Sequence, residues 1–260
     1  MSPIIDVERV SKVFHVPTVR RDTVRDHVLD LFRPRPVARF PVLDDVSFSV
    51  RRGETLGIMG RNGSGKSTLL KIVAGIYQPD RGRVTTHAPI TPILELGVGF
   101  NPELDAIDNA FLIGSVMGLS LQEIRAGLAD ILAFAEVERF ARLKLQHYST
   151  GMAARLAYAI AFRAVREILI LDEIFAVGDE GFQSRCKDRY RELRAAGHTV
   201  LLVSHNPKII REFCDRAILL EEGRVRAEGA PARVCDAYVD VTSRPVPSER
   251  EPTHAGARGD

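Results

Sequence analysis

The most informative segment of this 260-residue chain reads Gly60-Arg61-Asn62-Gly63-Ser64-Gly65-Lys66-Ser67-Thr68, and it follows the apolar run Thr55–Met59. The apolar run is expected to be a strand, and a helix is expected from about Lys66 to Ala74, closed by Gly75. In such a turn the glycines let backbone N–H groups curl around phosphate oxygens, and the helix adds its positive N-terminus. The flanking strand and helix argue against a glycine-rich turn that binds nothing. The segment therefore predicts a site for a nucleoside triphosphate.

Two carboxylates downstream complete the chemistry that such a site needs. Lys66 is placed to reach the β- and γ-phosphates, and the Ser67 hydroxyl is placed to bind Mg²⁺. The run Ile168–Leu171 is typical of a buried parallel strand, and Asp172 and Glu173 follow it directly. Asp172 can bind the same Mg²⁺, while Glu173 can activate the attacking water as a general base. Paired acids also occur in solvated turns, but the phosphate-binding segment favours the catalytic interpretation.

A histidine follows a third apolar run. His205 comes after Thr199–Val203, separated from it only by Ser204. A lone histidine at a strand end is usually structural. Because neighbouring parallel strands end at the same edge of a sheet, His205 is instead expected to contact the γ-phosphate or the attacking water.

The N-terminal part of the chain is predicted to be rich in β-structure. Short apolar runs at 4–14 and 42–60 predict strands separated by turn signals. The segment 19–39 between them reads as an inserted amphipathic helix, and it carries six Arg and three Asp.

The remainder of the chain is predicted to form a helical lobe, further strands and a tail. The lobe is expected at about 100–165, where Ser120 and Glu123 form a capping-box pattern. Residues 243–260 are rich in Pro, Arg and Glu, which predicts a disordered tail after one domain that spans 1–242.

The composition excludes several classes of protein. A net charge of +2 is too small to indicate a nucleic-acid partner. Cys186, Cys214 and Cys235 are scattered without a C-x-x-C pair, which favours reduced structural thiols over a metal or redox site. No run approaches the ~18 apolar residues of a membrane-spanning helix, and Met1 to Glu8 alternate charged and apolar residues, unlike a signal peptide.

The order and spacing of these motifs resemble the nucleotide-binding subunit of an ABC transporter. The resemblance covers residues 4–240 and implies an α/β fold. That fold has a RecA-like P-loop ATPase core, an N-terminal antiparallel β part and a helical lobe that carries the signature. The matching motifs are Walker A at 60–67, the signature Tyr148-Ser149-Thr150-Gly151-Met152, Walker B at 168–172 with Glu173, the D-loop Ala176-Val177-Gly178-Asp179 and the switch histidine His205.

The resemblance also implies ligands and partners. ATP and Mg²⁺ are the expected ligands, and a homodimer that drives integral membrane permease subunits is the expected assembly. In this family two domains stack head to tail, so that the signature of one copy closes over ATP held by the other. Ser149, Thr150, Gly151 and Met152 would thus complete the partner's site, with Asp179 in the D-loop. A helix start with free amides suits this role. The subunit is expected at the cytoplasmic face of the bacterial inner membrane.

Departures from the common family pattern point to a subfamily. The usual signature is Leu-Ser-Gly-Gly-Gln, whereas Tyr148, Thr150 and Met152 stand here. Asn101 stands where the family's Q-loop usually has glutamine, so the resemblance implies that Asn101 belongs to the ATP site and reaches Mg²⁺ or the water once the site closes. These features, and the run 176–186, look like the ATPases that export O-antigen, capsule and teichoic acid. Their signatures are similar to Tyr-Ser-Ser-Gly-Met. The resemblance therefore implies export of a lipid-linked polysaccharide.

Two further expectations come from the same resemblance. Phe14 matches the aromatic residue that stacks on adenine, with a core phenylalanine as the alternative. The insertion at 19–39 looks like a helix that lies near the membrane in O-antigen exporters, with a helix packed on the domain's own sheet as the alternative.

Three rival functions are open at this point. The first is another transported cargo, which the loop 94–104 and the D-loop region disfavour. The second is a non-transport ABC protein of DNA repair or translation, which usually has tandem domains or long coiled coils. The third is a subunit that binds ATP without turnover, which Glu173 and His205 disfavour.

Overall fold

The computed structural model describes residues 3–17, 37–94, 99–173, 175 and 178–243. Three predicted features therefore lie wholly or largely outside the described residues. These are the inserted helix at 19–39, the first two D-loop residues at 176–177 and the tail at 243–260.

The core of the protein is a six-stranded sheet in the order β5-β6-β7-β3-β8-β9. All neighbouring pairs are parallel except β8 and β9, which are antiparallel. The central strands are buried on both faces, as continuous apolar runs predict. The strands are β3 (Thr55–Met59), β5 (Ile90–Ile93), β6 (Ile168–Asp172), β7 (Thr199–Val203), β8 (Arg216–Glu221) and β9 (Arg224–Gly229).

Strand register brings the predicted motifs to one edge of this sheet. Val203 pairs with Asp172 on one side and with Ile58 on the other, so β6, β7 and β3 end together. The phosphate-binding segment, the two carboxylates and His205 each follow one of these strand ends. The edge expected from the sequence is therefore formed by adjacent strands.

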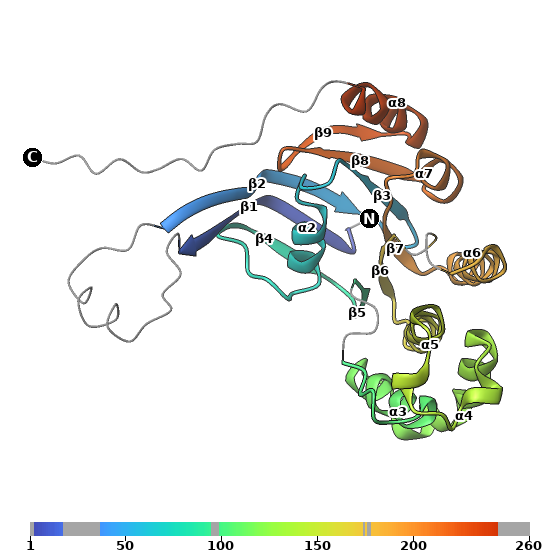
Figure 1. Cartoon of the computed structure of the whole chain (residues 1–260). Helices are drawn as coiled ribbons and strands as arrows, with labels where there is room; N and C mark the ends of the chain where they lie inside the picture. The colour runs from blue at the N-terminus through green and yellow to red at the C-terminus, as the bar shows by residue number, and fades with distance from the viewer. Residues whose placement is uncertain (1–2, 18–36, 95–98, 174, 176–177, 244–260) are drawn as a thin grey trace, which may run out of the picture.

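Successive residues of the central strands pack into two separate cores. Leu56 and Ile58 face a core that includes α2 (Lys66–Val73), whereas Met59 faces the opposite core. The second core contains residues of α6 (Glu180–Ala195), α7 (Pro207–Phe213) and α8 (Pro231–Thr242). Figure 1 shows α2 on one side of the sheet and these three helices on the other.

A three-stranded antiparallel sheet covers the α2 side of the core. Its order is β2-β1-β4, with β1 (Ile5–Pro17) between β2 (Val37–Val50) and β4 (Arg81–Thr86). Arg9 and Asp45 have positive φ at irregularities of this sheet. The predicted antiparallel part is confirmed, although β1 and β2 extend beyond the expected bounds 4–14 and 42–60. The last residues of the expected insertion belong to β2.

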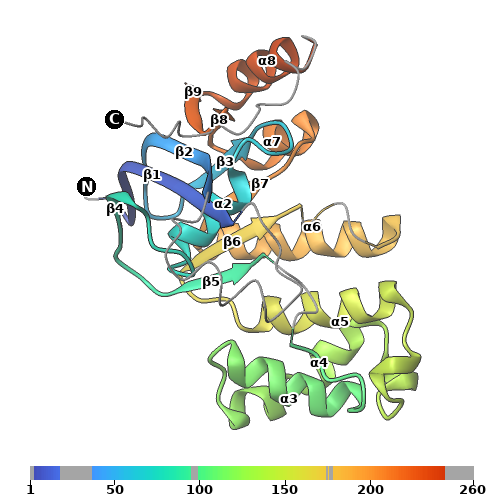
Figure 2. The ribbon, with the colours of Figure 1, turned by 60° about the vertical axis from the view of Figure 1, so that its left-hand side comes forward.

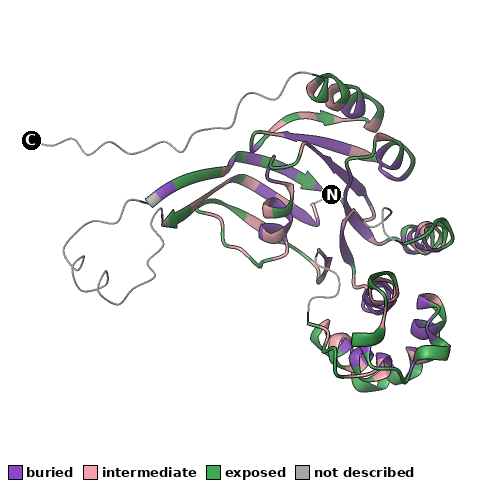
Figure 3. Ribbon diagram, viewed as in Figure 1, coloured by how far each residue is buried: buried purple, intermediate pink, exposed green. Residues whose placement is uncertain are grey.

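The helical lobe hangs from one end of the large sheet (Figure 2). Helix α5 (Thr150–Arg163) is capped by Ser149 and packs against both α3 and α4 of the lobe. The capping box predicted for Ser120 and Glu123 is present. The outer helix faces are exposed, while the face of α5 toward the core is buried (Figure 3). The elements are α3 (Ala106–Val116), α4 (Leu121–Ala135), η1 (Glu138–Phe140), η2 (Leu145–His147) and α5 (Thr150–Arg163).

None of the helices in the described part of the chain is long and apolar enough to cross a membrane.

Candidate functional site

The phosphate-binding segment forms a tight loop between β3 and α2. Gly60 lies so close to its surroundings that a Cβ atom there would overlap the Leu220 carbonyl oxygen and the Ser64 hydroxyl. Gly65 has φ +102°, and a Cβ on it would lie 2.8 Å from the Val42 carbonyl oxygen. Both positions therefore require glycine, as the motif predicts. The loop leads directly into α2, which begins at Lys66.

Lys66 folds back onto this loop. Its Nζ donates hydrogen bonds to the carbonyl oxygens of Gly60 at 2.7 Å and Arg61 at 2.9 Å. Burial lowers the pKa of the Lys66 ammonium, and the negative charges of Glu173 and Asp172 oppose that change. The ammonium is thus held beside the loop at the place where a phosphate would bind.

The Ser64 hydroxyl marks the same loop as a site for a polar ligand. It is buried and has no hydrogen-bond partner within the described residues. An unpaired buried hydroxyl costs free energy, so a ligand that accepts from it stabilises the loop. Phosphate oxygens are acceptors of this kind.

Asp172 at the end of β6 has the environment expected of a metal ligand. Burial and the charge of Glu173 raise the pKa of the Asp172 carboxyl, whereas Lys66 and a hydrogen bond from Ser67 lower it. A carboxylate in contact with a hydroxyl offers two hard oxygen donors at one position. Mg²⁺ takes oxygen donors of this type, so Ser67 and Asp172 fit the predicted ion.

Glu173 and His205 form a hydrogen-bonded pair at the adjacent strand ends. Glu173 Oε1 accepts a hydrogen bond from the His205 backbone amide at 2.9 Å and lies 2.8 Å from His205 Nδ1. The Glu173 amide donates to the Val203 carbonyl at 3.1 Å, which anchors the residue to β7. Glu173 has φ +51°, a sparsely populated conformation for a residue other than glycine. Such strain is concentrated at functional positions, which agrees with the predicted catalytic role.

The signature residues form the exposed start of α5. Ser149 is the N-cap, and its hydroxyl accepts a hydrogen bond from the Met152 amide at 3.2 Å. Tyr148 donates to the Phe140 carbonyl at 2.9 Å, which fixes the approach to the helix. Thr150 and Gly151 are exposed, and a Cβ on Gly151 would meet nothing closer than 3.9 Å. The helix N-terminus thus remains open to an anion from outside the chain.

Arg155 ties the signature helix to the D-loop, a link that sequence reasoning missed. Its Nε donates to the Ala135 carbonyl at 3.1 Å, and its guanidinium lies 3.6 Å from Asp179 Oδ2. Asp179 caps α6 by accepting from the Phe182 amide at 2.8 Å. The predicted D-loop residue therefore has two structural contacts of its own.

Asn101 has a local role in this structure. Its side-chain oxygen accepts from the Glu103 amide at 3.0 Å, so it closes its own turn. The fully buried Asn109, which sequence reasoning also missed, binds the backbone of Asn101 in both directions, at 2.8 and 3.0 Å. Asn101 is exposed next to the residues 95–98 that are not described, and its predicted role toward ATP stays a prediction.

Phe14 lies half-buried on β1, where its ring meets Tyr77 edge to face, 5.7 Å between ring centroids. The ring is therefore partly open to a ligand, as a role in adenine stacking requires.

Arg61 joins the phosphate loop to the last described helix. Its Nη2 donates to the carbonyl oxygens of Val241 at 2.7 Å and Thr242 at 2.8 Å, at the C-terminus of α8. Carbonyl groups at a helix C-terminus lack partners inside the helix, and the helix dipole places negative charge there. The Arg61 guanidinium supplies both hydrogen-bond donors for these carbonyl groups and a positive charge at the helix C-terminus.

Replacing Arg61 by Ala is expected to lower the free energy of unfolding by about 1.5–3 kcal/mol, the range for hydrogen bonds to charged groups. Urea denaturation measures this change. Arg211→Ala is the matched control, since Arg211 contacts α8 through an exposed ion pair with Asp236 and is expected to cost at most about 1 kcal/mol. An equal cost for both variants would show that the α8 carbonyl contacts add nothing.

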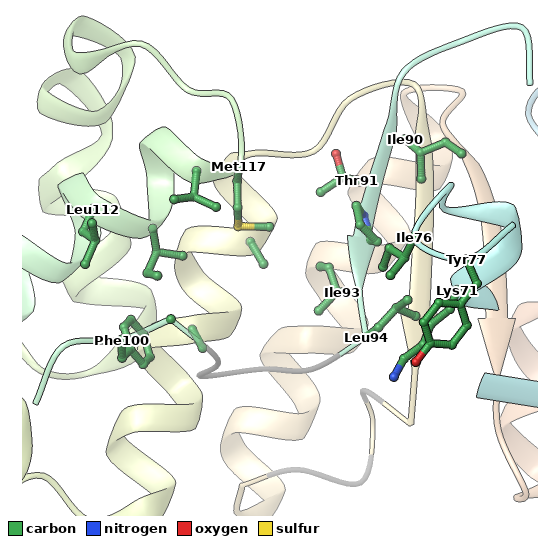
Figure 4. Close-up of a pocket in the computed structure, with 16 residues that line it drawn as sticks. Lys71, Ile76, Tyr77, Ile90, Thr91, Ile93, Leu94, Phe100, Leu112 and Met117 are labelled. Atoms are coloured by element: carbon green, nitrogen blue, oxygen red, sulfur yellow. The ribbon is translucent and has the colours of Figure 1, made fainter. Parts of the chain in front are cut away.

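A cavity of 620 Å³ lies between the sheet and the helical lobe. Its walls come from the end of α2, from β5 and from the lobe, and most of its lining side chains are apolar (Figure 4). Val116 at its rim is 77% exposed and Leu112 is 39% exposed. Exposed apolar side chains around an open cavity are typical of a surface that receives a partner.

Together these features define a P-loop ATPase whose helical lobe presents a second, exposed helix start. The sequence model of the ABC transporter family matches residues 43–176. The chain belongs to the ABC transporter family, as its motifs predict, and its enzymatic class is ATPase.

Curated relatives place the chain more closely. It is 36% identical over 242 residues to the O-antigen export system ATP-binding protein RfbB of Klebsiella pneumoniae, covering 92% of this chain and 98% of RfbB. It is 43% identical over 199 residues to the ABC transporter protein AbcA of Aeromonas salmonicida. That match covers 76% of this chain but only 65% of AbcA, so AbcA is the longer protein. The similarity to RfbB confirms the predicted polysaccharide-export subfamily.

A solved ATP-binding subunit of an ABC transporter has the same fold. It superposes with a TM-score of 0.73 at 25% identity, over 92% of this chain and all of the other. The predicted fold class is thereby confirmed.

Proposed function

We propose that this chain hydrolyses ATP in a head-to-tail dimer and thereby drives a separate permease to export a lipid-linked polysaccharide, such as an O-antigen. The observation that carries the proposal is the signature Tyr148–Met152 at the start of α5, whose central residues Ser149, Thr150 and Gly151 are exposed. Its sequence is of the polysaccharide-exporter type, and its open helix start suits the γ-phosphate of ATP held by another copy. The similarity to RfbB supports the same cargo.

The residues divide into roles that follow from their contacts. The amides of the loop at 60–68, with Lys66, bind the phosphates, and Phe14 stacks on adenine. Mg²⁺ binds at Ser67 and Asp172, where it neutralises phosphate charge. These assignments rest on the loop geometry and on the position of the Ser67 hydroxyl, which is near enough to Asp172 to lower the pKa of its carboxyl.

Glu173 is the proposed general base, and His205 positions it. The two residues are in hydrogen-bond contact. His205 is also proposed to bind the γ-phosphate as the site closes. Signature residues Ser149 to Met152 and Asp179 complete the site of the partner copy.

The permease is proposed to dock at the 620 Å³ cavity between the sheet and the helical lobe. A cytoplasmic helix of the permease with apolar side chains fits an open apolar cavity of this kind. The dimer would thereby be held at the cytoplasmic face of the inner membrane.

Val116→Glu is expected to lower export strongly while leaving basal ATP hydrolysis near the parent rate. Val116 is 77% exposed in the isolated chain, so the new charge is hydrated until a permease helix covers it and leaves it buried without a partner. We expect surface polysaccharide to fall at least about tenfold, the effect of 1.4 kcal/mol in docking. The assay is a deletion strain complemented with each variant, combined with ATPase rates of the purified chain.

Leu121→Glu is the matched control, because Leu121 is 60% exposed on α4 and does not line the cavity. It should restore export fully. Equal export by both variants would show that the permease does not dock at this cavity. A deletion strain with unchanged surface polysaccharide would refute the proposed cargo.

A further inference from the structure

The aromatic ring of Phe14 is contacted by Tyr77, which follows the phosphate-loop helix, and by Lys12 on its own strand. Tyr77 meets it edge to face, with 5.7 Å between the centroids and 73° between the ring planes. Lys12 Nζ lies 5.7 Å from the Phe14 centroid. Both contacts act on the ring itself, so together they restrict its tilt.

Hydrogen bonds also link the two residues of β1 just before Phe14 to the turn that follows Tyr77. Lys12 Nζ donates to the Gln78 carbonyl and to Asp80 Oδ1, each at 2.9 Å. The Val13 amide donates to Asp80 Oδ2 at 2.6 Å. The turn at 77–80 is therefore hydrogen-bonded to the segment of β1 that carries Phe14.

This turn is also joined to the phosphate loop. The amides of Ile76 and Tyr77 both donate to the Lys71 carbonyl, at 2.8 and 3.1 Å. Lys71 Nζ lies 5.5 Å from the centroid of the Tyr77 ring. Lys71 belongs to the last turn of α2, whose first residue is Lys66. Tyr77 thus connects the helix that binds phosphate with the ring proposed to bind the base.

The position of Tyr77 differs from that of an ordinary core residue. Tyr77 is only half-buried and, with Lys71, lines the cavity between sheet and lobe (Figure 4). A side chain that filled the core would be enclosed by apolar neighbours. Tyr77 packs against the edge of the apolar core but also contacts Phe14, the Lys71 ammonium and the open cavity.

We propose that Tyr77 is a positioning residue for adenine: it sets the tilt of the Phe14 ring relative to the phosphate loop and so adds to the affinity for the base. The inference rests on the proposed role of Phe14 in adenine stacking. Because an edge-to-face contact uses the ring and not the hydroxyl, phenylalanine should replace tyrosine at position 77, whereas an aliphatic residue should not.

The test compares ATP with inorganic tripolyphosphate, which has the phosphates but no base. Dissociation constants are measured by isothermal titration calorimetry on the full chain with Mg²⁺. Tyr77→Leu is expected to weaken ATP about three- to tenfold, the effect of losing an aromatic pair, and to leave tripolyphosphate unchanged. Tyr77→Phe should retain both affinities. Tyr77→Met, which has a flexible side chain of similar length, should behave like Tyr77→Leu.

Each other result has a definite meaning. Parent-like ATP affinity in Tyr77→Leu and Tyr77→Met would overturn the inference, as would an equal loss for tripolyphosphate, which indicates a general disturbance of the loop. Phe14→Leu tests the adenine site independently of Tyr77. If Phe14→Leu leaves the ratio of the two affinities unchanged, the proposed adenine site itself is wrong. If Phe14→Leu alone lowers the ratio, only the role of Tyr77 fails.

Discussion

Replacing Glu173 by Gln is expected to lower kcat for ATP hydrolysis by about 10²- to 10⁴-fold, the usual contribution of a general base. Glutamine keeps the shape of the side chain and its hydrogen bond with His205, but it cannot take a proton from water. Binding of ATP should be retained, because the phosphate loop and Lys66 are unaltered. The variant should therefore accumulate as an ATP-bound dimer, which size-exclusion chromatography detects.

Glu167→Gln provides the matched control, since Glu167 precedes the opposite end of β6 and forms an exposed ion pair with Arg52. Its rate should equal that of the parent. Hydrolysis by Glu173→Gln at the parent rate would remove Glu173 from the role of base.

Mixing two inactive variants is expected to restore hydrolysis if each site is shared between copies. Ser149→Arg blocks the signature, and Lys66→Ala disables the phosphate loop, so a dimer of either variant has two defective sites. A mixed dimer has one site with both defects and one intact site. Random pairing makes about half of the dimers mixed, so roughly a quarter of the parent rate should return.

The control mixture combines Lys66→Ala with Glu173→Gln. Both changes affect the same half of the site, so no mixed dimer contains an intact site and no activity should return. If the first mixture is no more active than the second, the signature does not act across a dimer interface.

Local motifs accounted for most of the fold and site because their geometry is set within a few residues. The helix start at Lys66, the N-cap at Ser149 and the carboxylates after β6 each depend on neighbours in sequence. Strand ends were less predictable. The β1–β2 ladder extends to Pro17 and Val37 through pairing between the two strands, which no local pattern encodes.

The connections between motifs were not predictable for the same reason. Arg61 contacts Thr242, which is 181 residues further along the chain, and Arg155 reaches Asp179 from a different helix. Side chains of these types are common on exposed surfaces, so composition carried no signal for them. The cavity likewise depends on how the lobe packs against the sheet.

The self-contact of Lys66 has a consequence for turnover. The ammonium already binds the carbonyl oxygens of Gly60 and Arg61, so an arriving phosphate must displace them. The attraction between the phosphate and the ammonium is partly offset by the loss of these two hydrogen bonds. The net affinity for the phosphate is therefore lower than the charges alone would give. When ADP leaves the proposed site, the two carbonyl oxygens can bind Lys66 again, which favours dissociation of the nucleotide. In the proposed ATPase cycle the loop therefore competes with the nucleotide for Lys66, and we expect this competition to favour release of ADP.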